Sequence, residues 1–140
     1  MRLLAIAAAL SAFCATASAQ TARLDVAGVW LTEARDGRIE IADCGDGTPC
    51  GRIVGGGDGV TAERFDTANP DPALRSRSLM NLRILSNYRR DGQRWVGGRI
   101  YEPDTGRTYG SRLHLGEDGA LRVQGCLGPI CQTQRWTRVR

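Results

Sequence analysis

Gly28-Val29-Trp30 begins the first strand-like stretch of this chain, and Trp136-Thr137-Arg138 ends the last one. A Gly-x-Trp on a first strand, with an Arg near the end of the last strand, is typical of small closed β-barrels. In such a barrel the Trp ring lies across one end, and a guanidinium can stack on it because an indole face attracts a cation. We therefore predict that Gly28, Trp30, Trp136 and Arg138 close one end of a barrel.

Eight short runs of alternating apolar and polar residues follow one another along the chain. Turns rich in Gly and Asp separate most of them, and this pattern predicts an all-β fold. Because most turns are short, sequential runs should pair as antiparallel neighbours, and closure into an up-and-down barrel leaves no exposed sheet edge. We expect eight strands at residues 26–33, 38–43, 51–55, 81–89, 94–101, 107–115, 120–125 and 132–139.

The longest connection spans residues 56–80. Within it, Asp71 can cap a short helical turn that has Pro72 in its first position. Loops of this length in compact domains are usually functional or disordered. We therefore expect one long loop that carries a short helical turn and covers the barrel as a lid.

The N-terminus has the layout of a cleavable signal peptide. Arg2 is followed by the apolar run 3–10 and by Ala17-Ser18-Ala19, a cleavage site of the A-x-A kind. We predict a signal peptide at 1–19 and a single domain at 20–140, in the periplasm or secreted. Phe13 precedes Cys14, where lipidation sites have a small residue, so we do not expect a lipoprotein. No other apolar run is long enough to cross a membrane.

Four cysteines follow the predicted signal peptide. An even number in an exported domain predicts disulfides, and three pairings are possible. Proximity in the sequence favours Cys44 with Cys50 and Cys126 with Cys131. A metal site is not expected, because there is no C-x-x-C and the chain has a single His, His114.

The charges are evenly scattered. Without Arg2 the domain has 18 basic and 15 acidic residues, a net charge of 18 − 15 = +3, and every basic residue is Arg. Base composition of the genome explains the absence of Lys; a preference for bidentate contacts with phosphate or carboxylate is the alternative. No block of like charges occurs, so we do not expect nucleic-acid binding.

Catalytic patterns are missing from the sequence. His114 alternates with Leu113 and Leu115, so it should lie on the outer face of its strand. Ser76 and Ser78 are not in a G-x-S-x-G elbow, and the glycines at 55–59 lack the Gly-Lys-Ser/Thr of a phosphate loop. We therefore expect no enzyme activity and no cofactor.

Binding residues are easier to nominate. Trp95, Arg99 and Tyr101 share one face of a regular strand at 94–101, and with Tyr109 and Gln134 they would suit a small amphipathic or anionic ligand. Alternatively, the aromatic residues fill the core, as is common in small barrels. Gly97-Gly98, inside the same strand, indicates a barrel corner in preference to room for a ligand.

Five blocks together resemble one bacterial family. They are Gly28-Val29-Trp30-Leu31-Thr32-Glu33, Cys50-Gly51-Arg52-Ile53-Val54, Asn69-Pro70-Asp71-Pro72-Ala73-Leu74-Arg75, Gly97-Gly98-Arg99-Ile100-Tyr101-Glu102-Pro103 and Gln134-Arg135-Trp136-Thr137-Arg138. The family is domain of unknown function 2147, whose members are small exported proteins similar to lipocalins. The resemblance implies an eight-stranded, lipocalin-like barrel, and by analogy alone a ligand.

Two functions are consistent with these expectations. The first is an exported protein that binds a small amphipathic or lipid-like molecule inside the barrel. The alternative is a protein-interaction or inhibitor module of the cell envelope that presents the 56–80 loop, with Arg75 and Arg77 as contacts. A hollow interior favours the first function, and a packed interior favours the second.

Overall fold

The computed structural model describes residues 24–59 and 63–139, so the predicted signal peptide at 1–19 lies outside the described residues. The fold is a single antiparallel sheet with one short 3-10 turn, η1 (Pro72–Leu74). The strands are β1 (Gly28–Leu31), β2 (Gly37–Asp43), β3 (Pro49–Gly56), β4 (Arg83–Ser86), β5 (Arg89–Asp91), β6 (Arg94–Glu102), β7 (Arg107–Leu115), β8 (Leu121–Leu127) and β9 (Ile130–Arg138).

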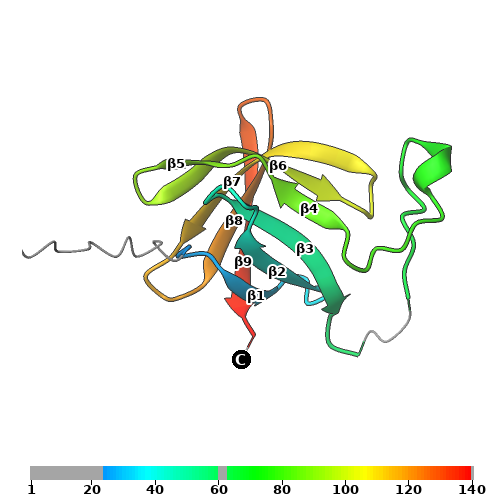
Figure 1. The fold of residues 1–140 in the computed structure, drawn as a ribbon, viewed down its shortest axis with the longest axis horizontal. Helices are drawn as coiled ribbons and strands as arrows, with labels where there is room; N and C mark the ends of the chain where they lie inside the picture. The colour runs from blue at the N-terminus through cyan, green and yellow to red at the C-terminus, as the bar shows by residue number, and fades with distance from the viewer. Residues whose placement is uncertain (1–23, 60–62, 140) are drawn as a thin grey trace, which may run out of the picture.

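The sheet closes into an eight-stranded up-and-down barrel (Figure 1). Its order is β4-β3-β2-β1-β9-β8-β7-β6-β5, and β4 also pairs with β6, which completes the circle. The run 81–89, predicted as one strand, is divided: β4 and β5 both pair with β6, and Asn87 between them has a φ of 65°. The two short strands thus occupy one position of the barrel.

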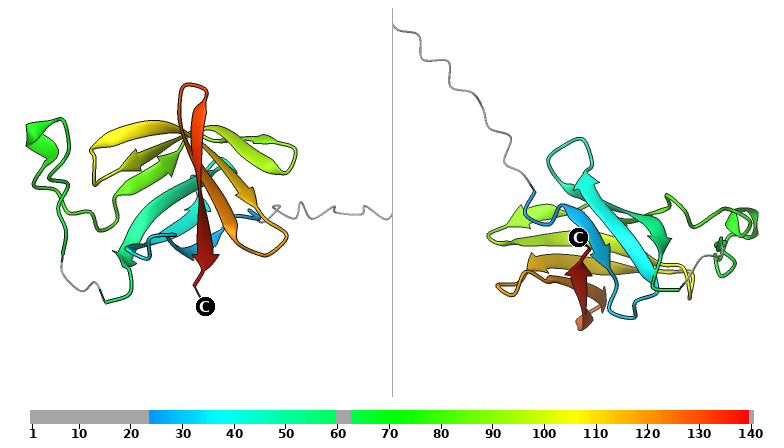
Figure 2. Two further views of the ribbon diagram at one scale, coloured as in Figure 1. Left: turned by 180° about the vertical axis from the view of Figure 1, so that it is seen from behind. Right: turned by 90° about the horizontal axis from the view of Figure 1, so that it is seen from below.

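The long connection between β3 and β4 projects to one side of the barrel (Figures 1 and 2). Its 3-10 turn begins as predicted, because the Asp71 carboxylate accepts a hydrogen bond from the backbone N–H of Ala73 at 3.0 Å and Pro72 follows the cap. Among the described residues, no helix is long and apolar enough to cross a membrane.

A β-bulge in β6 changes which residues share a face. Trp95 pairs with Leu113 and Gly98 pairs with Ser111, so two residues on β6 lie opposite one residue on β7. The prediction that Trp95, Arg99 and Tyr101 lie on one face is therefore wrong: Trp95 is buried inside the barrel, whereas Arg99 is exposed on the outside. Alternation along a strand cannot reveal an inserted residue.

The two glycines at this bulge have separate roles. Gly97 adopts a φ of 69°, a conformation that glycine reaches without steric cost. Gly98 faces inward, where an added Cβ would lie 2.2 Å from the ring of Tyr88. A buried aromatic ring fills that space, so the glycine pair forms the predicted barrel corner and leaves no room for a ligand there.

The ladder between β1 and β9 is short. These strands share two paired positions, Trp30 with Arg138 and Leu31 with Thr137. β1 ends at Leu31, and beyond it the carboxylate of Glu33 accepts a hydrogen bond from the backbone N–H of Arg135 at 2.8 Å. A side chain thus continues the contact with β9 toward the end of the barrel that carries the β8–β9 hairpin, the wide end; the opposite end is the narrow end.

The last turn is shorter than the predicted turn at 126–131. Cys126 and Cys131 lie directly opposite one another within β8 and β9, so they are strand residues and not turn residues. The turn itself is formed by Gly128 and Pro129 alone. Two-residue hairpin turns often have Gly at the first central position, because that position has a positive φ. Gly128 occupies it with a φ of 59°.

Candidate functional site

A cavity of about 910 Å³ occupies the wide end of the barrel. Its mouth is surrounded by the β1–β2 turn, the β6–β7 turn, the β8–β9 hairpin and part of the long loop. The inner wall is apolar because inward-facing strand positions carry branched and aromatic side chains, among them Ile39, Ile53, Ile84, Ile100, Val123 and Trp136. An eight-stranded barrel can hold one small ligand, and this one is hollow enough to do so.

One wall of the cavity carries uncharged polar groups. Tyr109 on β7 and Gln132 and Gln134 on β9 all line the cavity. Gln134 is oriented by the cavity floor: its Oε1 accepts a hydrogen bond from Nε1 of Trp136 at 2.8 Å. Its amide nitrogen, a donor, then remains for a bound molecule. This wall can therefore recognise a polar, uncharged group on an otherwise apolar ligand.

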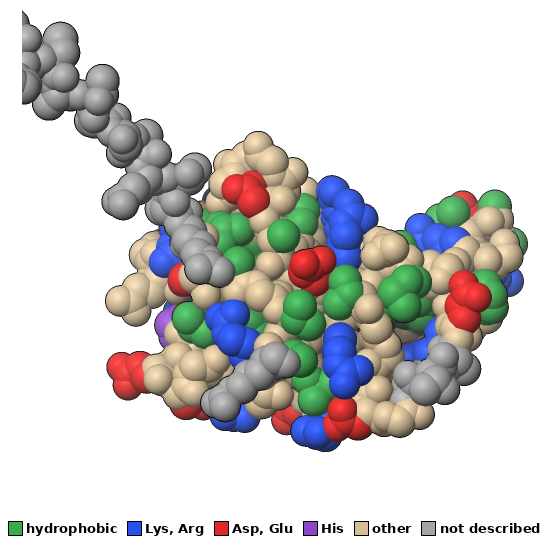
Figure 3. All heavy atoms as spheres, turned by 60° about the horizontal axis from the view of Figure 1, so that its bottom comes forward, with side chains coloured by type: hydrophobic (Ala, Val, Ile, Leu, Met, Phe, Trp, Pro, Cys, Tyr) green, Lys and Arg blue, Asp and Glu red, His purple; other side chains and the backbone are tan. Residues whose placement is uncertain are grey.

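The mouth is mainly acidic. Four carboxylates line it, those of Asp36, Glu63, Glu102 and Asp104, together with a single guanidinium, that of Arg64. Arg64 pairs with Asp104 at 2.5 Å. This local negative charge contrasts with the chain as a whole, which is basic, and with the outer surface in Figure 3, where acidic, basic and apolar side chains are mixed.

The long loop is fixed to the barrel by a buried carboxylate. Asp66 has no exposed surface, and it accepts hydrogen bonds from the hydroxyl of Tyr101 at 2.5 Å and from Nδ2 of Asn69 at 2.8 Å. Arg77 completes the cluster, with Nη2 2.7 Å from Asp66. The two ends of this segment, Glu63-Arg64 and Ser78-Leu79-Met80, line the cavity mouth, so the Asp66 cluster fixes that side of the mouth.

The pKa values in this cluster follow from the same contacts. Burial raises the pKa of Asp66, but the hydrogen bonds from Tyr101, Asn69 and Arg77 outweigh it, so the pKa lies below its ordinary value. Burial, and then the neighbouring Asp66 carboxylate, raise the pKa of Tyr101. Asp66 is therefore ionised and Tyr101 is neutral near pH 7, which is the combination that the hydrogen bonds require.

The two arginines of the protein-interaction alternative are engaged within the loop. Arg77 pairs with Asp66, and Nε of Arg75 donates to the backbone carbonyl of Asn69 at 2.8 Å. Both side chains therefore stabilise the loop itself.

The narrow end of the barrel is closed by Trp30. The ring is fully buried, and its Nε1 donates to the carbonyl of Val26 at 2.9 Å. The guanidinium of Arg138 lies over the ring, with Cζ 4.2 Å from the centroid, and donates to the carbonyl of Ala27 at 2.7 Å. Gly28 has a φ of 138°, which favours glycine, and an added Cβ would lie 2.2 Å from that guanidinium and displace it.

Two further features brace the narrow end. Nε1 of Trp95 donates to the Asp25 carboxylate at 3.0 Å, and Arg90 both pairs with Asp25 and stacks over the Trp95 ring. Burial raises the pKa of Asp25, but the hydrogen bonds from Trp95 and Arg90 lower it by more, so the pKa lies below its ordinary value. Trp95, nominated as a ligand contact, thus lies against the closed end and away from the cavity.

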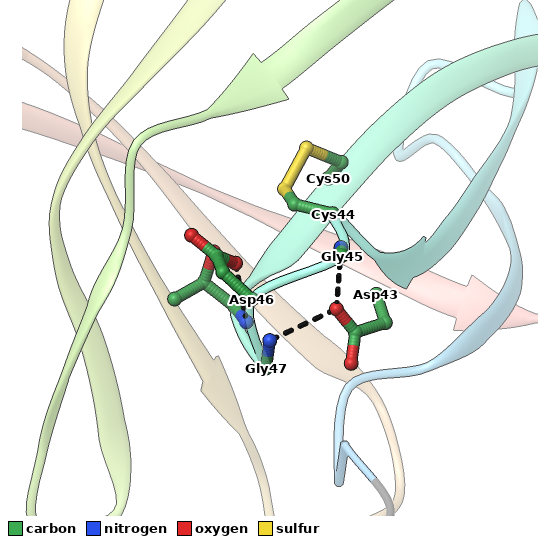
Figure 4. The surroundings of a disulfide bond; sticks show 7 residues. Asp43, Cys44, Gly45, Asp46, Gly47 and Cys50 are labelled. Atoms are coloured by element: carbon green, nitrogen blue, oxygen red, sulfur yellow. Dashed lines mark hydrogen bonds between the residues drawn. A yellow bond between two sulfur atoms is a disulfide. The ribbon is translucent and has the colours of Figure 1, made fainter.

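The β2–β3 turn at this end is cross-linked by the predicted Cys44–Cys50 disulfide (Figure 4). Inside the loop, one oxygen of Asp43 accepts hydrogen bonds from the backbone N–H groups of Gly45 at 2.6 Å and Gly47 at 2.9 Å. The second predicted disulfide, Cys126–Cys131, lies at the opposite end, next to the cavity mouth. Each end of the barrel therefore has one disulfide, as an exported protein can maintain.

The predicted ligand residues are partly brought together. Tyr101, Tyr109 and Gln134 line the cavity, whereas Trp95 and Arg99 do not. Trp136, predicted as part of the closure, is the floor between the closed end and the cavity. The sequence did not predict the isoleucines of the cavity wall or the carboxylates of its mouth as site residues. The alternation of Ile39 and Ile41 along β2 indicates an inward face, but it does not indicate whether the space behind that face is packed or hollow.

The histidine and the candidate metal ligands do not form a cluster. In the described parts of the chain, no three side chains among His, Cys, Asp and Glu gather closely enough to hold a metal ion. His114 lies between Arg94 and Arg122 on neighbouring strands, at the closed end of the barrel. The cavity itself offers apolar contact and hydrogen-bonding groups.

Comparison with known proteins places this barrel in a family. No curated protein matches the chain significantly. Among solved structures, it is similar to protein HP1028 from the human pathogen Helicobacter pylori, which is described as belonging to the lipocalin family; the TM-score is 0.72, with 24% identity, 81% of this chain covered and 82% of that one. This likeness shows a lipocalin-like fold. The model of an uncharacterised protein family conserved in bacteria, DUF2147, matches residues 28–138, from the closing glycine to the stacked arginine, so the chain belongs to that family.

Proposed function

We propose that the barrel binds a small molecule with an apolar body and an uncharged or cationic polar group. The observation that carries this proposal is the hollow interior, a cavity of about 910 Å³ with an apolar floor and walls. Binding pockets for small molecules typically measure roughly 300–1,000 Å³. Transfer of apolar ligand surface from water to such a wall is favourable by about 25 cal/mol per Å², which is sufficient driving force for a lipid-like body.

The charges at the mouth support the choice of polar group. An anionic group would approach four carboxylates and a guanidinium, Arg64, that already pairs with one of them. Arg99, the cation expected to receive an anionic ligand, points to the outside. Clefts lined by charge of one sign attract the opposite sign, so a cationic or neutral amphiphile is favoured over an anionic one.

Filling the cavity from within provides the test. Gly125 lies on the cavity wall, and an added Cβ would meet Ile100 and Tyr109 only at ordinary contact distances of 3.7 and 3.9 Å. Gly125→Leu should therefore fold and occupy part of the cavity. We expect it to weaken binding of the neutral fluorescent probe N-phenyl-1-naphthylamine at least tenfold, about 1.4 kcal/mol, measured by fluorescence titration.

Gly110→Leu is the matched control. Gly110 is exposed on the outer face of β7, and its nearest neighbours belong to Cys126, at 3.7 Å or more. This variant should bind the probe like the unmodified protein. Displacement by amphiphiles with the same twelve-carbon tail then tests the polar group: dodecyltrimethylammonium should displace the probe at lower concentration than dodecyl sulfate, and added salt should reduce the difference. Equal binding by both leucine variants would contradict the proposal.

A further inference from the structure

The large apolar side chains that are clearly exposed belong to two segments of the chain. Within residues 24–59 and 63–139, the clearly exposed ones lie on the long loop or on the β8–β9 hairpin: Phe65, Leu74, Met80, Leu127 and Ile130. The two hairpin residues are the most exposed, Leu127 at 69% and Ile130 at 73%. Exposed apolar side chains that cluster usually mark an interaction site.

These two side chains lie side by side at the end of the hairpin, on the face that continues into the cavity. Leu127 and Ile130 are directly paired across the strands and flank the two-residue turn. The disulfide between Cys126 and Cys131 lies one position behind them. The tip projects beyond the other strands in Figures 1 and 2, and its two apolar side chains are not covered by any of the described residues.

The segment around the tip is free of charge. Residues 123–134 contain no Asp, Glu, Lys, Arg or His, although charged residues make up 24% of the chain; Arg122 and Arg135 mark its two ends. Charged side chains are the groups that most strongly oppose entry into the apolar part of a membrane. Their absence over the whole distal hairpin removes that opposition.

We propose that the tip of the β8–β9 hairpin inserts Leu127 and Ile130 into the surface of a lipid bilayer, with the cavity mouth next to the membrane. This inference rests on the proposed function, because it explains how an apolar ligand reaches the cavity. Three residues are exposed and also line the cavity: Leu127, Ile130 and Met80. The apolar surface therefore continues from the tip along Gly125 and Val123 into the cavity.

A bilayer fits the shape of the tip better than a protein partner does. A stable protein interface buries about 800 Å² on each side. The tip is a narrow projection with two large side chains, and it offers much less than that. A bilayer surface, in contrast, accepts small apolar projections whose depth is set by the polar groups behind them. Here those groups are the neutral side chains of Gln124, Gln132 and Thr133.

Vesicle binding tests the proposal. The purified protein is sedimented with vesicles of zwitterionic phosphatidylcholine, so that its positive net charge adds little attraction. We expect binding, and we expect the double variant Leu127→Ser/Ile130→Ser to lower the vesicle partition coefficient at least about tenfold. Leu74→Ser, which removes an exposed leucine outside the cavity lining, is the matched control and should bind as before. Unchanged thermal denaturation verifies that the variants fold.

The outcomes separate this inference from the proposed function. Titration with N-phenyl-1-naphthylamine in the absence of vesicles reports on the cavity alone. If the cavity binds no probe but the tip binds vesicles, the proposed function fails and the docking surface stands. If the protein does not bind vesicles, or the double variant binds as strongly as the unmodified protein, the docking surface is wrong. A dimer that forms in solution and is lost in the double variant, without vesicle binding, would also overturn it.

Discussion

The two ends of the barrel differ in how far their large apolar side chains are buried. At the narrow end, Trp30 is buried, hydrogen-bonded and covered by the Arg138 guanidinium. At the wide end, Leu127 and Ile130 are exposed beside an unfilled cavity. The buried groups of the narrow end stabilise the fold, whereas the wide end leaves apolar surface exposed, and this is the surface that the proposed ligand and bilayer would cover.

The largest effect is expected from removing the closing indole. Trp30→Ala should lower the free energy of unfolding by about 3–5 kcal/mol, because it deletes a fully buried aromatic side chain and leaves a cavity. It also leaves the carbonyl of Val26 and the Arg138 guanidinium without their partner. Urea denaturation monitored by circular dichroism measures the loss.

Leu127→Ala is the counterpart at the wide end. Its side chain is 69% exposed, so the change in the free energy of unfolding should stay within about 0.5 kcal/mol. Similar losses for Trp30→Ala and Leu127→Ala would mean that the two ends do not divide their roles in this way.

Removal of either disulfide should cause a stability loss of intermediate size. The two close loops of nearly equal length, with sequence separations of 6 and 5, so chain entropy alone predicts a similar loss of about 2 kcal/mol for each. Cys50 is buried in the narrow end, whereas Cys126 and Cys131 lie next to an exposed tip that can fray without disturbing the core.

We therefore expect Cys44→Ser/Cys50→Ser to lower the melting temperature more than Cys126→Ser/Cys131→Ser does. Differential scanning calorimetry measures both variants under one set of conditions. A larger effect at the hairpin would show that the tip contributes to the barrel core, contrary to its exposure.

The division between the ends also explains which parts of the molecule could be predicted from sequence. The strands, the disulfides and the 3-10 turn depend on alternation, cysteine spacing and capping residues, which are local signals. The face of Arg99 depends on a bulge, and a bulge depends on which residues pair across strands. Whether the barrel is hollow depends on how far the inward side chains reach, and this leaves no periodic trace in the sequence.

The long loop belongs to the wide end but is held by a buried carboxylate, that of Asp66. It should therefore respond to acid before the barrel does. The pKa of Asp66 is lowered in the folded protein from its ordinary value of 3.8. Stability from a carboxylate with a lowered pKa is present above the ordinary value and is lost as the pH falls through it toward the folded value. As the pH falls below about 4, opening of the contacts of Asp66 with Tyr101 and Arg77 should therefore become progressively easier.

This smallest effect is confined to the loop, and hydrogen exchange followed by mass spectrometry can measure it. The amides of Asp66 and Leu79, which bond to the carbonyls of Arg77 and Arg64, report on the loop. After correction for intrinsic rates, their exchange should accelerate severalfold between pH 6 and pH 3, because Asp66 takes up a proton more readily when the loop is open than when it is closed. Asp66→Asn should show the faster exchange at both pH values. The core amide of Leu113 should be unaffected in both proteins, and an acceleration there equal to that in the loop would mean that loop and barrel open together.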